Sequence, residues 1–241
     1  MIDAPKAPVF AGSRVAFFGG SFDPPHRGHL AIAHAARAAL ALDTVLFAPV
    51  GTQPLKPAGS TAPFADRVSM TQLAIAGEPG FALSLVDAPS PTGVPNYTID
   101  TLHALRAQLP SGGALFCLLG GDSFLNLHQW HRGAQIPFAA ELIVAARPGQ
   151  PLADLAAALP AGLTLESGSE QRSTPGGIDL RTYTLRSPSG AAAPFHLLPG
   201  LHYDISATSL RRQIRSAAAD PADLSPAVLA YIRQHGLYRN A

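Results

Sequence analysis

The sequence predicts an α/β fold, a Rossmann-like doubly wound parallel sheet in a single domain (residues 1–241) with a helical C-terminal part. Short apolar runs, which suit strands buried on both faces, alternate with Ala- and Leu-rich stretches at helical spacing. Gly and Pro follow several of these runs, as expected where strands end in turns. The length suits one α/β domain with an insertion better than two full domains.

The first 50 residues predict a βαβ unit. Residues 14–19 contain a continuous apolar run that ends in Gly-Gly, and residues 45–50 form a second apolar run. Residues 30–42, which lie between them, are rich in Ala and Leu at helical spacing. A strand, a helix and a parallel strand within about 35 residues make a βαβ unit.

The alternation of strands and helices continues to about residue 150. Pro110 stops one of the predicted helices, and Asn96 is a candidate N-cap at its start. We expect helices over residues 64–76 and 97–109, and strands over residues 81–86, 114–119 and 142–146.

The pattern weakens in the last third of the chain. After a short helix over residues 151–159, residues 168–200 are rich in Ser, Thr, Gly and Pro. We interpret them as an extended-loop or hairpin insertion, with one strand-like piece at 182–185, that serves as a surface flap or packing element. Helices are expected again over residues 206–218 and 225–235, the second stopped by Gly236. The core of the domain is therefore expected over about 14–150 and 200–238.

Composition excludes several classes of protein. The formal net charge is +1 and only 14% of residues are charged, so the clustered basic face of a nucleic-acid binder is not expected. No apolar run is long enough to span a membrane, and residues 1–14 lack the apolar core of a signal peptide, so we expect a cytoplasmic protein. The single Cys117 lies in an apolar run and is expected to be a buried thiol. No zinc-ligand spacing occurs, so no protein metal site is expected.

The first predicted strand runs into a turn that suits a phosphate. Residues 19–29 read GGSFDPPHRGH. Gly19 and Gly20 let backbone N–H groups approach a phosphate closely. His26 and His29 lie three residues apart at a helix start, so both can face the positive end of the helix dipole. Beside an anion either imidazole could donate a charged hydrogen bond, although a single histidine there could also be a surface or capping residue.

A second candidate anion site opens the helix predicted over residues 206–218. Ser206, Thr208 and Ser209 bring hydroxyl groups to unpaired backbone N–H groups, and Arg211 follows within two turns. Taken alone, this pattern is also that of a simple N-cap with a surface arginine. Together with residues 19–29, it predicts a site for a triphosphate.

These two stretches resemble the motifs of a known superfamily. The string 19–29 is similar to the signature of nucleotidyltransferases with an HxGH motif, and residues 205–211 resemble their second motif, usually Ile-Ser-Ser-Thr followed by Arg. Ala207 stands where the family generally has Ser. The stretches 96–102, 120–124 with Trp130, 147–149 and 231–238 resemble those of bacterial nicotinate-nucleotide adenylyltransferases. The resemblance runs from about residue 14 to 238, outside 168–200.

The resemblance implies adenylyl transfer from ATP to nicotinate mononucleotide, with Mg²⁺ accompanying the ATP. The catalytic residues that it implies are His26, His29 and Arg211. The ATP-binding residues that it implies are Gly19, Gly20, Ser21, Phe22, Ser206, Thr208 and Ser209. The residues that it implies for the nicotinate nucleotide are Lys56, Tyr97, Thr98, Asp122, Trp130 and His131.

The prediction of a nicotinate acceptor depends most on Trp130, the only tryptophan of the chain. The indole of Trp130 could stack on a pyridine ring, with a cation–π contribution of about 0.5–2 kcal/mol. The alternative is a core tryptophan, although His128, Gln129 and His131 make its surroundings polar. By resemblance, the nicotinate carboxylate lies near Tyr97, Thr98 and His131.

Two residues of the acceptor set have simpler alternatives. By resemblance Asp122 contacts a ribose or supports the nucleotide, and it could also be a helix N-cap. Lys56 offers a mobile cation for a phosphate or is a solvated surface lysine. Leu55, before it, stands where the family commonly has His, so the polar contacts of this loop are less defined.

Two rival functions remain open at this point. The same core also carries transfer to nicotinamide mononucleotide or phosphopantetheine and cytidylyl transfer, and Trp130 with residues 97–102 favours the nicotinate acceptor. A nucleotide-binding regulator without turnover is the other rival, and the presence of His26, His29 and Arg211 argues against it. The sequence leaves open whether the chain forms a homo-oligomer.

Overall fold

A computed structural model of the 241-residue chain describes residues 12–56, 59–146, 149, 151–166, 170–174, 176–201, 205–216 and 223–239. The strands are β1 (Arg14–Gly20), β2 (Thr44–Pro49), β3 (Phe81–Leu83), β4 (Ala114–Gly120), β5 (Glu141–Ala145), β6 (Thr164–Leu165), β7 (Glu170–Ser173), β8 (Asp179–Arg186) and β9 (Ala192–Leu198). The helices are α1 (Arg27–Leu40), α2 (Phe64–Ala74), α3 (Thr98–Arg106), α4 (Gly121–Leu125), α5 (Ile136–Ala139), α6 (Leu152–Ala157), α7 (Ala207–Arg215) and α8 (Pro226–Gln234), with 3₁₀ turns η1 (Leu127–Gln129) and η2 (Gly133–Gln135).

One sheet runs through the molecule in the order β3-β2-β1-β4-β5-β9-β8-β6, with β7 beside β8. The strands from β3 to β9 are parallel, and β6, β7 and β9 pair antiparallel with β8. The chain moves outward from β1 to β2 and β3, then returns to the other side of β1 to form β4. This reversal confirms the doubly wound fold and puts its ligand crevice at the carboxyl ends of β1 and β4.

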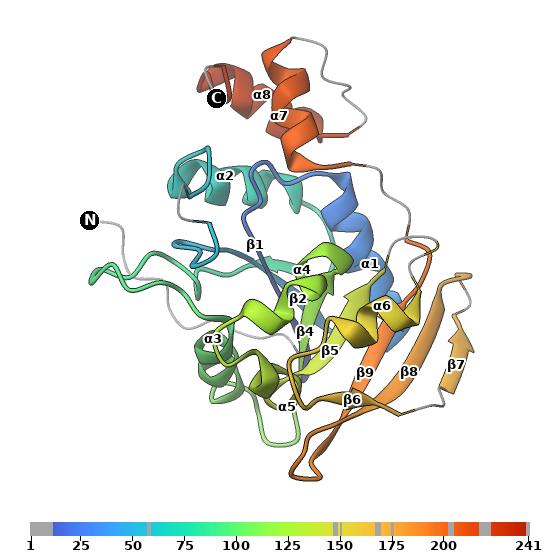
Figure 1. Cartoon of the computed structure of the whole chain (residues 1–241). Coiled ribbons are helices and arrows are strands. Elements are labelled where there is room, and N and C mark those ends of the chain that lie inside the picture. Colours follow the sequence, from blue (N-terminus) through green and yellow to red (C-terminus); the bar gives the residue numbers. More distant parts are fainter. Residues whose placement is uncertain are drawn as a thin grey trace.

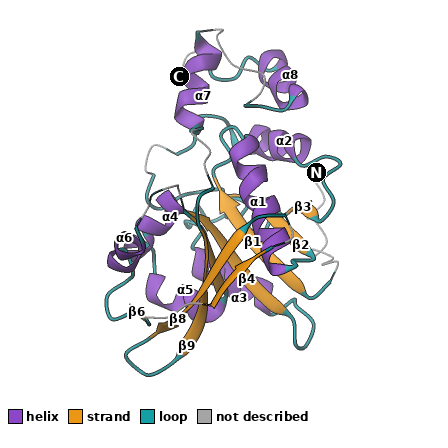
Figure 2. Cartoon of the chain, turned by 90° about the vertical axis from the view of Figure 1, so that its right-hand side faces the viewer, coloured by secondary structure: helices purple, strands orange, loops and turns teal. Residues whose placement is uncertain are grey.

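The central strands are buried on both faces, because helices cover both sides of the sheet (Figures 1 and 2). In β1, Val15 and Phe17 pack into a core on the side of α3, α4 and α5, whereas Ala16 and Phe18 pack against α1. This explains why the strands read as unbroken apolar runs. Cys117 lies in β4 on the first of these faces, and burial raises the pKa of its thiol to about 12, as expected of a core thiol.

The C-terminal helices form a small third core with α2, next to the carboxyl ends of the strands (Figure 1). Met70 of α2, Leu210 of α7 and Val228 of α8 are buried together there. The C-terminal part is therefore helical as predicted, and it brings the start of α7 to the crevice. None of the helices in the described part of the chain is long and apolar enough to cross a membrane.

The expectation of a loop or hairpin insertion at residues 168–200 is wrong in one respect. β8 and β9 do form a hairpin, but β9 also pairs parallel with β5, so it is the sixth strand of the doubly wound order. The Thr-rich strand β8 covers the far edge of β9. Alternating polar residues in β8 and the Pro of β9 concealed this pair in the sequence.

Several predicted boundaries differ from the observed ones. The first helix begins at Arg27, so His29 lies inside its first turn. Asn96 does not cap α3, because its side-chain oxygen accepts the N–H of Thr52 and its side-chain nitrogen donates to the carbonyl of Ala88. Residues 217–218 of the predicted helix and residues 147–148 of the family-like stretch lie outside the described residues.

Candidate active site

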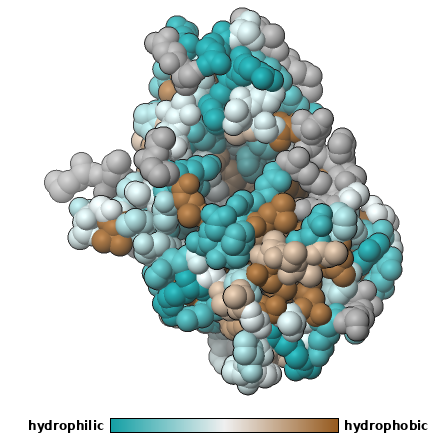
Figure 3. All heavy atoms as spheres, in the orientation of Figure 1, coloured by the Kyte–Doolittle hydropathy of each residue, from teal (hydrophilic) through white to brown (hydrophobic). Residues whose placement is uncertain are grey.

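A cleft of about 840 Å³ opens at the carboxyl ends of β1, β4 and β5. Figure 3 shows the hollow between the C-terminal helices and the rest of the face. All of the predicted site residues except Ser209 line it, namely Gly19, Gly20, Ser21, Phe22, His26, His29, Lys56, Tyr97, Thr98, Asp122, Trp130, His131, Ser206, Thr208 and Arg211. Ser209 lines a smaller adjoining hollow. Residues from distant parts of the sequence therefore meet in one site.

The two histidines lie face to face at the start of α1. Their ring centroids are 3.8 Å apart at an interplanar angle of 33°. The backbone N–H of His26 donates to Nδ1 of His29 at 3.2 Å. Since Nδ1 accepts, the proton of a neutral His29 ring is on Nε2, which makes that atom a hydrogen-bond donor. The ring of Phe22 packs edge-to-face with the imidazole of His29, with ring centroids 5.0 Å apart at an interplanar angle of 66°.

Glycines and a buried aromatic ring shape the turn before the histidines. A Cβ on Gly19 would lie 2.6 Å from the ring of Phe17, and one on Gly20 would lie 3.2 Å from the ring of Phe22. Phe22 has φ of 46° and its side chain is buried, so it acts in the site through His29. A side chain would therefore crowd a buried ring at both positions, more severely at Gly19 than at Gly20.

Burial keeps both imidazoles neutral in the unliganded protein. It lowers the pKa of His26 to about 4. Burial, and then the charge that His26 would carry, lower the pKa of His29 well below 6.5. The charged hydrogen bond that either ring is expected to donate beside an anion therefore stays a prediction, because it requires a ligand that raises the pKa of the ring. A polyphosphate would raise both proton affinities again.

These shifts predict a stability that depends on pH. Because the unfolded chain binds protons at His26 below pH 6.5 while the folded chain resists them down to about pH 4, stability falls as the pH falls. We expect His26 alone to reduce the free energy of unfolding by about 2 kcal/mol between pH 7.5 and 5. Urea unfolding of wild type and His26→Gln at both pH values measures this. Equal losses in the two proteins would contradict it.

A buried carboxylate that sequence reasoning missed organises the turn. Asp23 is 4% exposed and accepts hydrogen bonds from the N–H groups of Thr61 at 2.6 Å and Ala62 at 3.1 Å. The hydroxyl of Tyr238 also donates to it, at 2.8 Å. Burial and this carboxylate raise the pKa of Tyr238. Asp23 therefore joins the phosphate turn to the start of α2 and to the C-terminal segment.

Arg67 of α2 is a second residue that sequence reasoning missed. Its side chain is 2% exposed, and its guanidinium donates to the carbonyls of Ser21 at 2.7 Å, Val50 at 2.8 Å and Ala62 at 3.2 Å. It thus holds the segments that follow β1 and β2 at a fixed separation. The sequence signal that could have found this buried arginine is its place on the face of the predicted helix that apolar residues otherwise occupy.

The start of α7 lies beside the turn that carries Asp23. Ser206 caps the helix, its hydroxyl accepting the N–H of Ser209 at 3.1 Å. The guanidinium of Arg211 donates to the backbone carbonyl of Asp23 at 2.7 Å and to the hydroxyl of Thr208 at 3.2 Å. Arg211 is therefore fixed in place, with further N–H groups left for an anion in the cleft.

At the opposite end of the cleft lie the aromatic residues predicted for the acceptor. Trp130 is half-buried, packing on the main core with one part and lining the cleft with another, and its stacking on a pyridine ring stays a prediction. The rings of Tyr97 and His131 lie 4.2 Å apart at 33°. Thr98 opens α3 beside them, and Asp122 lies in the first turn of α4. This end suits a flat ring.

Lys56 lies close to the phosphate turn. Its Nζ donates to Oγ of Ser21 at 3.0 Å, and that hydroxyl donates to Gln53 at 3.2 Å. The lysine side chain is exposed, and its hydrogen bond to Ser21 holds its ammonium group at the edge of the cleft. A cation here would face both the turn and the acceptor end of the cleft.

Asp87 is a further buried carboxylate in the cleft wall. The hydroxyl of Thr101 in α3 donates to it, and burial raises the pKa of Asp87 to about 6. The contact fixes the first turns of α3, which carry Tyr97 and Thr98. Among the residues that the structure describes, no three His, Cys, Asp or Glu side chains gather as a metal site.

Comparison with known proteins places this geometry in a family. Residues 17–213 match the cytidylyltransferase-like family. The chain is 38% identical over 228 residues to a probable nicotinate-nucleotide adenylyltransferase of Gloeobacter violaceus, covering 94% of this chain and 97% of the relative. It is 39% identical over 230 residues to one of Chromobacterium violaceum, covering 94% and 99%.

Solved structures support the fold independently. The Plasmodium falciparum nicotinic acid mononucleotide adenylyltransferase complexed with NaAD superposes with a TM-score of 0.65 at 14% identity, over 94% of this chain and 98% of the other. At that identity the likeness shows the fold alone, whereas the sequence relatives show the family. The chain therefore belongs to the cytidylyltransferase-like family and, within it, to the nicotinate-nucleotide adenylyltransferases.

Proposed function

We propose that this chain transfers the adenylyl group of ATP to the phosphate of nicotinate mononucleotide, giving deamido-NAD and pyrophosphate. The observation that carries the proposal is one cleft with two anion-binding helix starts at one end and an aromatic end at the other. The names of the sequence relatives support the same substrates. Phosphopantetheine has no flat ring for the aromatic end, whereas nicotinamide mononucleotide carries the same pyridine ring and differs from the nicotinate compound only in its carboxamide.

Catalysis in this site rests on positioning and on charge stabilisation. A phosphate oxygen of the acceptor attacks the α-phosphorus of ATP in line, and the bond to the bridging oxygen breaks with its electron pair leaving on pyrophosphate. No covalent enzyme intermediate is needed, because nucleophile and leaving group are already phosphates. Nε2–H of His29 and the guanidinium of Arg211 stabilise the charge that develops on the oxygens.

The remaining residues hold the substrates. The turn from Gly19 to Ser21 and the helix start at Ser206 and Thr208 bind the phosphates of ATP through N–H and hydroxyl groups. Mg²⁺ accompanying ATP would be held mainly by phosphate oxygens and water, and its positive charge would offset the negative charge of the triphosphate. His26 stays beside His29 and supports its orientation through the backbone bond.

The acceptor is recognised at the aromatic end. We place the pyridine ring against Trp130, and its carboxylate near the start of α3 with Thr98 and His131. Asp122 is positioned for the ribose, and Lys56, held over the turn, for the acceptor phosphate. This assignment separates the residues that recognise the acceptor from those that hold ATP.

Trp130→Ala is therefore expected to raise KM for nicotinate mononucleotide about 10-fold, since ring stacking of this kind contributes about 0.5–2 kcal/mol. KM for ATP should stay within about twofold of wild type, because the phosphate turn does not contact Trp130. Steady-state kinetics with each substrate varied separately measure both constants, and a thermal melt checks that the core is intact. Equal rises in the two KM values would contradict a role in acceptor binding.

One assay tests the function itself. Pyrophosphate release from ATP is measured with nicotinate mononucleotide, nicotinamide mononucleotide and phosphopantetheine as separate acceptors. We expect the highest kcat/KM with the nicotinate compound. A higher value with another acceptor would replace the substrate assignment, and no release with any of them would favour a nucleotide-binding regulator.

A further inference from the structure

A second hollow, of about 410 Å³, adjoins the main cleft on the outer side of α7. The two cavities share Thr61, Ser206, Thr208 and Arg211 in their walls. The smaller one continues outward past Arg211, where Arg215 lines it. An anion leaving the cleft on this side would therefore pass from Arg211 toward Arg215.

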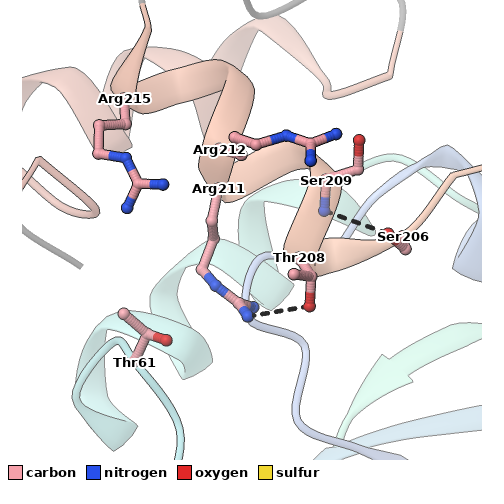
Figure 4. A pocket seen from close by; sticks show the side chains of 7 residues that line it. All are labelled: Thr61, Ser206, Thr208, Ser209, Arg211, Arg212 and Arg215. Atoms are coloured by element: carbon pink, nitrogen blue, oxygen red, sulfur yellow. Dashed lines mark hydrogen bonds between the residues drawn. The ribbon is translucent and has the colours of Figure 1, made fainter.

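Three arginines of α7 line this hollow, and the guanidinium groups of two of them, Arg211 and Arg215, converge on it. Arg215 follows Arg211 by four residues, so both lie on the same side of α7, about 6 Å apart along the axis. Figure 4 shows both side chains pointing down from the helix on the side of Thr61, whereas Arg212 points the other way, beside Ser209. No Asp or Glu side chain is among the residues that line the hollow.

The two arginines differ in what holds them. Arg211 donates to Asp23 and Thr208 and is half-buried. Arg215 is exposed, and among the described residues no hydrogen bond or ion pair of its guanidinium occurs. A fixed cation at the cleft and an adjustable one further out suit an anion that moves outward. Two guanidiniums one turn apart suit two linked phosphoryl groups better than a single phosphate.

We propose that pyrophosphate binds in this hollow as it leaves the active site, with Arg211 at the inner end and Arg215 and the Thr61 hydroxyl at the outer end. The proposal rests on the proposed function, which supplies pyrophosphate as the leaving group. Once the bond at the α-phosphorus breaks, the departing group exchanges contacts with the phosphate turn for contacts with Arg215. Arg215 thereby holds pyrophosphate at the outer end of the hollow while leaving acceptor recognition unchanged.

Binding of inorganic pyrophosphate to the full-length protein tests this directly, by isothermal titration without either nucleotide. Arg215→Gln should weaken pyrophosphate binding about 10-fold, as expected for loss of one charged hydrogen bond, and inorganic phosphate binding by much less. Arg233→Gln removes the same charge from the neighbouring helix α8, outside the residues that line the hollow, and should change pyrophosphate binding less than about twofold. Both positions are exposed and Gln favours helix, so both variants should fold; thermal melts confirm it.

Product inhibition gives a second measurement. In the forward assay, Arg215→Gln should raise the inhibition constant of added pyrophosphate about 10-fold while KM for the acceptor stays unchanged. Equal weakening by Arg215→Gln and Arg233→Gln would mean unspecific attraction to the positive charge of the C-terminal helices and would overturn the site, as would unchanged binding in Arg215→Gln. If the wild type binds pyrophosphate as expected but releases none from ATP, the proposed function fails while the hollow stands.

Discussion

His29→Ala is expected to lower kcat by at least about 100-fold while the melting temperature changes little. Removing one hydrogen-bond donor to a developing oxyanion typically costs about 2.7–4 kcal/mol of transition-state stabilisation. His29 is such a donor because the N–H of His26 occupies its Nδ1 and leaves the proton on Nε2. Pyrophosphate release at saturating ATP and acceptor measures the loss.

Two companion variants separate chemistry from packing. His29→Gln keeps an amide donor at a similar reach and should recover part of the lost rate. His34→Ala removes a half-exposed histidine from the same helix, where it pairs with Glu78 rather than with the cleft, and should turn over like wild type. Turnover of His29→Ala near that of wild type would exclude His29 from the mechanism.

The pH response of the same residue adds a constraint. Since the pKa of His29 is lowered by burial, its ring stays neutral across the physiological range in the free enzyme. In the free enzyme the available donor is therefore Nε2–H of a neutral ring, set by the tautomer, and a bound triphosphate would raise the pKa of His29 toward the charged donor. The sequence could show the spacing of the two histidines but not this state, because the state depends on how deeply the rings are buried.

Much of the fold could be predicted because strands buried on both faces leave unbroken apolar runs. The run before Gly19, the run over residues 45–50 and the one around Cys117 all became central strands. β9 could not be found this way. Its partner β8 alternates Arg and Thr with apolar residues. The parallel pairing of β9 with β5 also joins positions far apart in the sequence.

The candidate site was predictable where its residues lie in short local patterns. The turn 19–29 and the start of α7 each form one such pattern, and the topology of the sheet brings them together. Asp23 and Arg67 escaped prediction because their roles consist of contacts to backbone groups of other segments. No local pattern encodes such contacts, although a charged residue that must be buried always needs partners of this kind.

Arg211→Ala is expected to lower kcat/KM for ATP by about 100-fold or more, because a planar cation fixed at the cleft is lost from the triphosphate site. Arg211→Lys should recover little. The guanidinium donates to the carbonyl of Asp23 through one nitrogen and to Thr208 through another. The ammonium of a lysine cannot make these two hydrogen bonds and bind a phosphate in the same geometry. Kinetics with ATP varied at saturating acceptor measure the effect.

The control for this variant is Arg212→Ala, the next residue on the same helix. It removes a guanidinium of equal charge, which makes no ion pair among the described residues and points away from Thr61 (Figure 4). We expect kcat/KM for ATP within about twofold of wild type there, since an exposed charge near a solvated site contributes about 0–1 kcal/mol. Similar losses in both variants would mean that α7 attracts ATP by net charge alone. A loss confined to Arg211 would mean that the anchoring of its guanidinium by Asp23 and Thr208 is what places the cation on the transition state.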